Sequence, residues 1–71
     1  MTTHQTYRKP TFACLRMAVT LRREARELTA DAENCGGKSR QDRLDSAAYA
    51  MNKARWLAGK ISNEAYRASL S

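Results

Sequence analysis

The first long segment of the chain repeats small or apolar residues at alternating steps of three and four. These positions are Thr11, Cys14, Ala18, Leu21, Ala25, Leu28, Ala32 and Cys35. Such spacing places them on one face of an amphipathic helix. Pro10 followed by Thr11 is typical of a helix start, with Thr11 as the N-cap. Gly36 can adopt the left-handed conformation that ends a helix. The pattern therefore predicts a helix over 11–34.

A second apolar pattern with the same spacing follows the glycines. Its positions are Leu44, Ala47, Met51, Ala54 and Ala58. Ser39 is the expected N-cap, and Asp42 three residues later gives a weak capping box. Gly59 ends the pattern, which predicts a helix over 39–58.

A third, shorter helix is predicted over 62–70. Ser62 is its expected N-cap, and Ile61 and Tyr66 have the spacing of a hydrophobic staple. Leu70 continues the apolar side that begins at Tyr66. A helix this short is marginal alone, so we expect it to dock on the others.

The short connection at 35–38 makes the first two helices antiparallel neighbours. Pairing back from it brings Ala25 near Ala48, and Ala18 near Ala54 or Arg55. The expected buried residues are Leu21, Ala25, Leu28, Ala48, Met51 and Ala54. The predicted fold is all-α: an antiparallel helical hairpin with a short third C-terminal helix docked at its open end.

The 71 residues allow one domain at most. Residues 1–10 are predicted to be a flexible basic arm, and 11–71 a single small helical domain. A second apolar patch of Phe12, Leu15 and Val19 lies off the first helix's main face. We expect the third helix to cover this patch.

Tyr49 and Trp56 lie a heptad apart, on the side of the second helix away from its apolar stripe. With Lys53 between them and Lys60 one turn beyond, they form one helical strip. Exposed aromatic residues beside a lysine are typical of binding hot spots. The strip is therefore a candidate partner-binding surface; the alternative is that Trp56 packs under the third helix.

The net charge of +6 suggests an acidic partner or a nucleic acid, although solubility alone also explains it. The candidate nucleic-acid-binding residues are Arg16, Arg22, Arg23 and Arg26. The acidic residues that accompany and follow them would repel phosphate: Glu24, Glu27, Asp31 and Glu33. We therefore rank nucleic-acid binding second.

Catalytic chemistry is not expected. His4 is the only histidine and lies in the predicted arm, so no oriented Cys–His or Ser–His pair is available. No zinc-ligand spacing occurs, and "CGGK" lacks the spacing and ending of a phosphate-binding loop. We expect no enzyme, no cofactor and no metal. Without a signal peptide or a membrane span, the expected location is the cytoplasm.

If one helix carries both Cys14 and Cys35, a rise of 1.5 Å per residue separates them by about 31 Å. A disulfide needs Cα atoms within about 7 Å, so none is expected within the chain. We interpret both as small buried hydrophobic residues. The alternative is an antiparallel homodimer through the first helix, in which Cys14 faces Cys35 of the other copy.

The stretch "ARWLAGKISNEAYRASL" resembles the SHOCT helical hairpin, through Gly59, Ile61, Ser62 and Tyr66. That resemblance implies a protein-interaction element. In size and Arg/Ala content, the chain resembles small accessory proteins of temperate bacteriophages of enteric bacteria. This second resemblance implies a protein that binds and modulates a host macromolecule.

The leading functional hypothesis is a small non-enzymatic helical protein that binds a host complex through protein–protein contact, and so inhibits or redirects it. The first alternative is a basic helical regulator that binds nucleic acid. The second alternative is a homodimeric structural protein.

Overall fold

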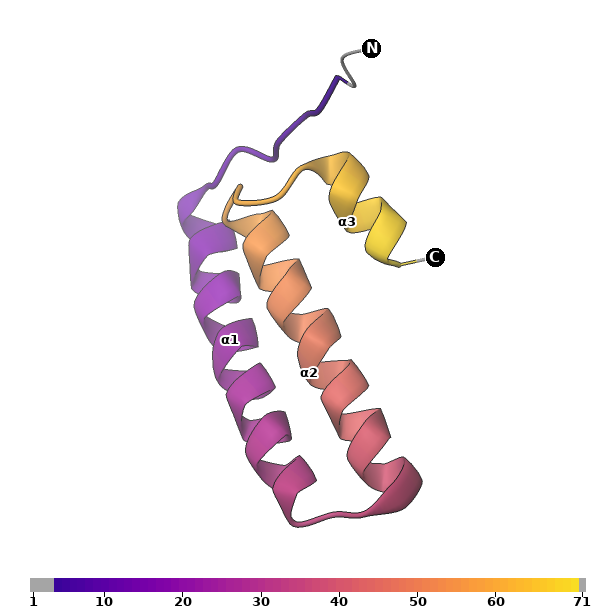
Figure 1. Ribbon diagram of the computed structural model, residues 1–71. Helices are drawn as coiled ribbons and strands as arrows, with labels where there is room; N and C mark the ends of the chain where they lie inside the picture. Colours follow the sequence, from indigo (N-terminus) through magenta and orange to yellow (C-terminus); the bar gives the residue numbers. More distant parts are fainter. Residues whose placement is uncertain (1–3, 71) are drawn as a thin grey trace.

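The computed structural model describes residues 4–70 and shows three helices: α1 (Phe12–Glu33), α2 (Gly37–Leu57) and α3 (Asn63–Ser69). The predicted all-α hairpin is confirmed: α1 and α2 run antiparallel, and α3 lies at their open end (Figure 1). Thr11 caps α1 as predicted, accepting a hydrogen bond from the Cys14 N–H at 3.2 Å. Ser62 likewise caps α3, accepting from the Ala65 N–H at 3.0 Å.

Small side chains line the contact between α1 and α2. Most of the buried residues form two clusters: Cys14, Ala18, Ala54 and Leu57 at the open end, and Ala25, Ala47 and Ala50 nearer the turn. Ala18 is fully buried and Ala25 is 2% exposed. Alanines on both helices let the two backbones approach closely, which favours this alignment over one with larger residues at the contact.

The predicted core is partly right. Ala25 and Ala54 are buried, while Leu21, Leu28 and Met51 are half-buried at the edges of the clusters. Ala48 is exposed, so its predicted burial opposite Ala25 is wrong.

Ala47 and Ala50 take the place expected for Ala48. With α2 turned this way, Ala47 and Ala50 are buried with Ala25, and the bulkier Met51 packs half-buried at the edge of this cluster. The predicted pairing of Ala18 with Ala54 is correct.

The turn between the hairpin helices is tighter than predicted. Gly37 has φ +60°, whereas Gly36, expected to be left-handed, has φ −129° and is the N-cap of α2. Since α2 begins at Gly37 with Gly36 as its N-cap, the predicted N-cap at Ser39 is wrong. Arg40 donates from Nε to the Ala32 carbonyl at 3.2 Å, which satisfies part of the C-terminal end of α1.

The end of α2 is a Schellman motif. Gly59 has φ +73°, its N–H donates to the Trp56 carbonyl, and the Lys60 N–H donates to the Arg55 carbonyl at 2.9 Å. The motif turns the chain so that α3 runs back along α2.

Within the described residues, α3 packs against α2 and not against α1. The three helices lie side by side with α2 in the middle, in a molecule of 43 × 31 × 12 Å (Figure 1). The expectation that α3 covers Phe12, Leu15 and Val19 is therefore wrong. Tyr66 of α3 stacks instead on Trp56 of α2, which packs half-buried against the cluster of Cys14, Ala18, Ala54 and Leu57, and this contact holds α3 on α2.

Candidate functional site

The indole of Trp56 lies between two other side chains. The Tyr66 ring stacks on it with centroids 4.3 Å apart and an interplanar angle of 5°. The Arg8 guanidinium lies 4.8 Å from the indole centroid, in cation–π contact. The indole N–H donates to Asn63 Oδ1 at 2.6 Å. Trp56 thus holds α3 and the N-terminal arm on α2, although its part in partner binding stays a prediction.

Thr6 and Tyr7 of the predicted arm contact the start of α3. The Asn63 N–H donates to the Thr6 carbonyl at 2.7 Å, beside an antiparallel bridge between Tyr7 and Ser62. The N–H of Thr6 donates to Glu64 Oε1 at 2.8 Å, and its hydroxyl donates to the same oxygen at 2.9 Å. These two hydrogen bonds from Thr6 lower the pKa of Glu64. The mobility of residues 1–10 stays a prediction, and residues 1–3 lie outside the described part.

The other residues of the predicted partner-binding strip remain accessible to different degrees. Tyr49 is 49% exposed, Lys53 is half-buried and Lys60 is exposed. Burial, and then hydrogen bonding with Tyr49, raise the pKa of Tyr66. Tyr49 therefore contacts Tyr66 in the middle of α3 and still presents half of its surface to solvent.

Sequence reasoning missed the two polar residues that complete the Trp56 environment, Arg8 and Asn63. Arg8 lies in a segment without periodicity, so no pattern pointed to it. Asn63 immediately follows the N-cap, where an asparagine is usually interpreted as part of the helix start.

An exposed apolar stripe lies on α1. Phe12 is 77% exposed, Leu15 43% and Val19 51%. Arg22 and Arg26 continue the same face, because the steps along 12, 15, 19, 22 and 26 alternate three and four. We call these five residues the α1 stripe.

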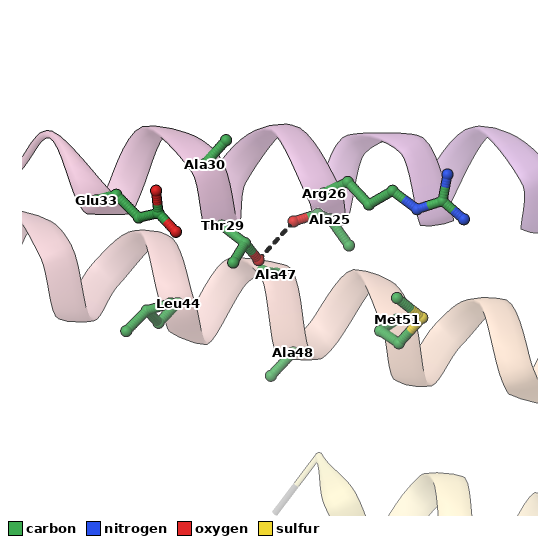
Figure 2. Close-up of a pocket in the computed structure, with 9 residues that line it drawn as sticks. All are labelled: Ala25, Arg26, Thr29, Ala30, Glu33, Leu44, Ala47, Ala48 and Met51. Carbon is green, nitrogen blue, oxygen red and sulfur yellow. Dashed lines mark hydrogen bonds between the residues drawn. The ribbon is translucent and has the colours of Figure 1, made fainter.

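A groove between the hairpin helices adjoins the α1 stripe at Arg26, which lines it (Figure 2). The groove has a volume of about 490 Å³, with Arg26 and Glu33 on the α1 side and Leu44 and Met51 on the α2 side. Small side chains lie between these rims: Ala25, Thr29, Ala30, Ala47 and Ala48. The Thr29 hydroxyl donates to the Ala25 carbonyl at 2.8 Å, so this polar group is satisfied within α1.

A second groove lies along α2 toward α3, and it shares Ala48 and Met51 with the first. Tyr49, Arg55 and Ser69 also line it. The two grooves therefore adjoin on one face of the helical layer.

The candidate nucleic-acid-binding arginines spread over two adjacent sides of α1. Arg16, Arg23 and Arg26 are exposed and Arg22 is half-buried. The Arg16 guanidinium lies 5.8 Å from the centroid of the Phe12 ring. Binding of nucleic acid by these residues stays a prediction.

The cysteines are free thiols, with Cys14 buried and Cys35 half-buried. Cys14 lies in the contact between α1 and α2, and Arg8 donates from Nε to its sulfur at 3.4 Å. Hydrogen bonding with Thr11 and then Arg8 lowers the pKa of the Cys14 thiol. The burial of Cys14 against α2 favours the small-hydrophobe interpretation; the homodimer stays a prediction.

Within residues 4–70, no three His, Cys, Asp or Glu side chains lie close enough together to hold a metal ion. Over the same residues, no helix combines the length and the apolar character needed to cross a membrane. Comparison of the chain with protein-family models, with curated proteins and with solved structures gives no match.

Proposed function

We propose that this chain is a non-enzymatic helical protein that binds a cytoplasmic host protein or complex and thereby inhibits or redirects it. The α1 stripe and the adjoining groove form the contact surface. The observation that carries this proposal is that α3 packs on α2, which leaves Phe12, Leu15 and Val19 exposed on α1.

Phe12, Leu15 and Val19 are large apolar side chains within two helical turns, and their exposure to water is unfavourable. Their burial by a partner would therefore contribute free energy to binding. Full burial of a Val, Leu or Phe side chain contributes about 1.5–3 kcal/mol. Leu15 and Val19 are each near half exposed, so roughly half of that amount is still to be gained at each. Clustered apolar exposure of this kind is typical of protein-binding sites.

A photo-crosslinking amino acid at Val19 tests this proposal in a bacterial lysate treated with nuclease. We expect one discrete protein adduct at Val19, lost on Leu15→Asp, and none from the same crosslinker at the exposed Glu27. The captured protein, once purified, should bind the wild-type chain and not the Leu15→Asp variant. Equal adducts from Val19 and Glu27 would contradict the proposal.

Nucleic-acid binding is the second candidate, favoured by the three exposed arginines of α1. In that case, log affinity for a duplex should fall linearly and steeply with log salt concentration. The double variant Arg22→Ala, Arg26→Ala should then lose binding. Sub-micromolar binding at physiological salt that the double variant lacks would place this function first.

A further inference from the structure

The α1 stripe and the groove form one extended surface. Phe12 to Arg26 spans about 21 Å along α1 at 1.5 Å per residue. Arg26 belongs to the stripe and also lines the groove opposite Met51. A partner lying on this surface would therefore meet exposed apolar side chains first and a shallow groove floored by alanines next.

Charge is unevenly placed on this surface. Arg22 and Arg26 flank its centre, and Arg55 lies on its α2 side; the acidic groups are Glu33, near the turn, and Asp45. The whole chain carries +6. Anionic groups along the middle of a partner would thus find two guanidiniums, whereas cationic groups would be repelled.

We infer that the occupant of this surface is an acidic amphipathic helix of another protein; this inference rests on the proposed function. Its apolar side would lie on Leu15, Val19 and Met51, with its carboxylates toward Arg22 and Arg26. Amphipathic helices bind grooves between helices through residues at i, i+3, i+4 and i+7. The small exposed residues Ala30 and Ala48, on the two sides of the groove, allow a third helix to approach closely.

A second copy of this chain is a poorer occupant. An antiparallel copy on the same face would bring its own Arg22 and Arg26 toward these two, since they lie near the middle of α1. Like charges placed against each other at an interface disfavour that pairing.

The test uses the full-length chain and two fluorescein-labelled peptides of about five helical turns. Both peptides carry the same leucines at i, i+3, i+4 and i+7, and they differ only in having glutamates or lysines on the flanks. Fluorescence anisotropy should show the glutamate peptide binding at least about tenfold more tightly than the lysine peptide. Val19→Asp should abolish binding of the glutamate peptide, with helicity checked by circular dichroism.

The decisive variant is Arg22→Glu, Arg26→Glu, which should reverse the preference between the peptides. Its matched control, Lys9→Glu, Lys38→Glu, makes the same change in net charge at exposed positions away from the surface, and should keep the preference. Equal binding of both peptides, or reversal in the control, overturns the inference.

Other occupants give different results. A homodimer in sedimentation experiments that Val19→Asp dissociates would assign the surface to a second copy. Tighter binding of a labelled RNA duplex, lost in the arginine variant, would assign it to nucleic acid. Retained protein capture at Val19 without a peptide preference would overturn only the acidic helix and leave the proposed function standing.

Discussion

Trp56 and Tyr66 stack almost in parallel, with ring centroids 4.3 Å apart, and this contact fixes α3 to α2. It explains why the chain's single tryptophan lies off the alanine stripe of its helix: its stacking partner Tyr66 belongs to α3, which packs on α2 and not on α1. The face of α2 turned to α3 is thus a second, aromatic packing surface.

Trp56→Ala should lower the free energy of unfolding by about 2–3 kcal/mol, because a large, partly buried ring and its stacking contact with Tyr66 are both lost. Trp56→Phe keeps a ring against Tyr66 but loses the hydrogen bond to Asn63, and should cost about 1 kcal/mol. Urea unfolding followed by circular dichroism measures both. Equal stability of Trp56→Ala and wild type would show that α3 is not held by this ring.

Neighbouring alanines test the alignment of α2. Ala47 is 7% exposed whereas Ala48 is exposed, so Ala47→Asp buries an unpaired carboxylate and Ala48→Asp does not. We expect Ala47→Asp to destabilise the hairpin by about 3 kcal/mol or more, and Ala48→Asp by about 0.5–1 kcal/mol. Thermal melts of the two variants measure this difference. A greater loss of stability in Ala48→Asp than in Ala47→Asp would support the alignment expected from sequence, with Ala48 buried.

The Thr6–Glu64 contact should make the docking of the arm depend on pH. Hydrogen bonding lowers the pKa of Glu64 below its ordinary value of 4.5, so the contact's stabilisation is present above that value. It is lost as the pH falls through the lower, folded-state pKa. NMR titration of the Thr6 amide should follow this transition and lose it in Glu64→Gln, with Glu27→Gln as a matched control. A Thr6 amide that titrates identically in Glu64→Gln would contradict the assignment.

Gly59→Ala should be more harmful than Gly37→Ala, although both glycines have positive φ. Left-handed backbone costs a residue with a Cβ about 1–2 kcal/mol at either site. At Gly59 the new Cβ would also lie 2.9 Å from the Arg8 carbonyl oxygen, whereas nothing lies within 4 Å at Gly37. Amide hydrogen exchange should show faster exchange around Asn63 in Gly59→Ala only. Equal losses of stability without that local effect would mean that Arg8 does not lie against the turn.

Tyr49→Ala separates folding from binding. Half of the Tyr49 surface is in solvent, so its removal should lower stability by about 1 kcal/mol or less. Binding to the protein captured at Val19 should weaken by about 1–2 kcal/mol, a factor of roughly 5–30, because Tyr49 lines the adjoining groove. Calorimetry with the purified partner measures this effect. A large loss of stability with unchanged affinity would place Tyr49 in the core alone.

Sequence periodicity predicted the hairpin and the N-caps at Thr11 and Ser62, because these residues and the spacing of the alanines are local signals. The start of α2 was harder to predict. Serine is a strong N-cap signal, but the φ that Gly37 adopts depends on how the whole turn closes. Whether Ala47 or Ala48 faces α1 depends on the same closure, since one residue rotates a helix face by about 100°.

The placement of α3 could not be derived from pattern alone. From the pattern alone, the apolar side chains of α3 were equally suited to pack on Phe12, Leu15 and Val19 of α1 or on Trp56 of α2. Flat stacking of two rings and the hydrogen bond from the indole to Asn63 are directional contacts, and no periodicity encodes them. For the candidate site, the sequence indicated Tyr49 and the arginines. The exposure of the α1 stripe, however, depends on the packing of α3 against α2, which the sequence pattern did not predict.

The contacts between the arm and α3 join residues 58 positions apart in the chain, as in the Thr6–Glu64 pair. The α1–α2 hairpin, by contrast, closes through a turn of a few residues, so the entropic cost of closing this loop is small. Contacts between distant positions are slow to form, and those exposed at an edge open with the least free energy. The hairpin should therefore form first during folding, and the two ends of the chain should join it last and separate from it first.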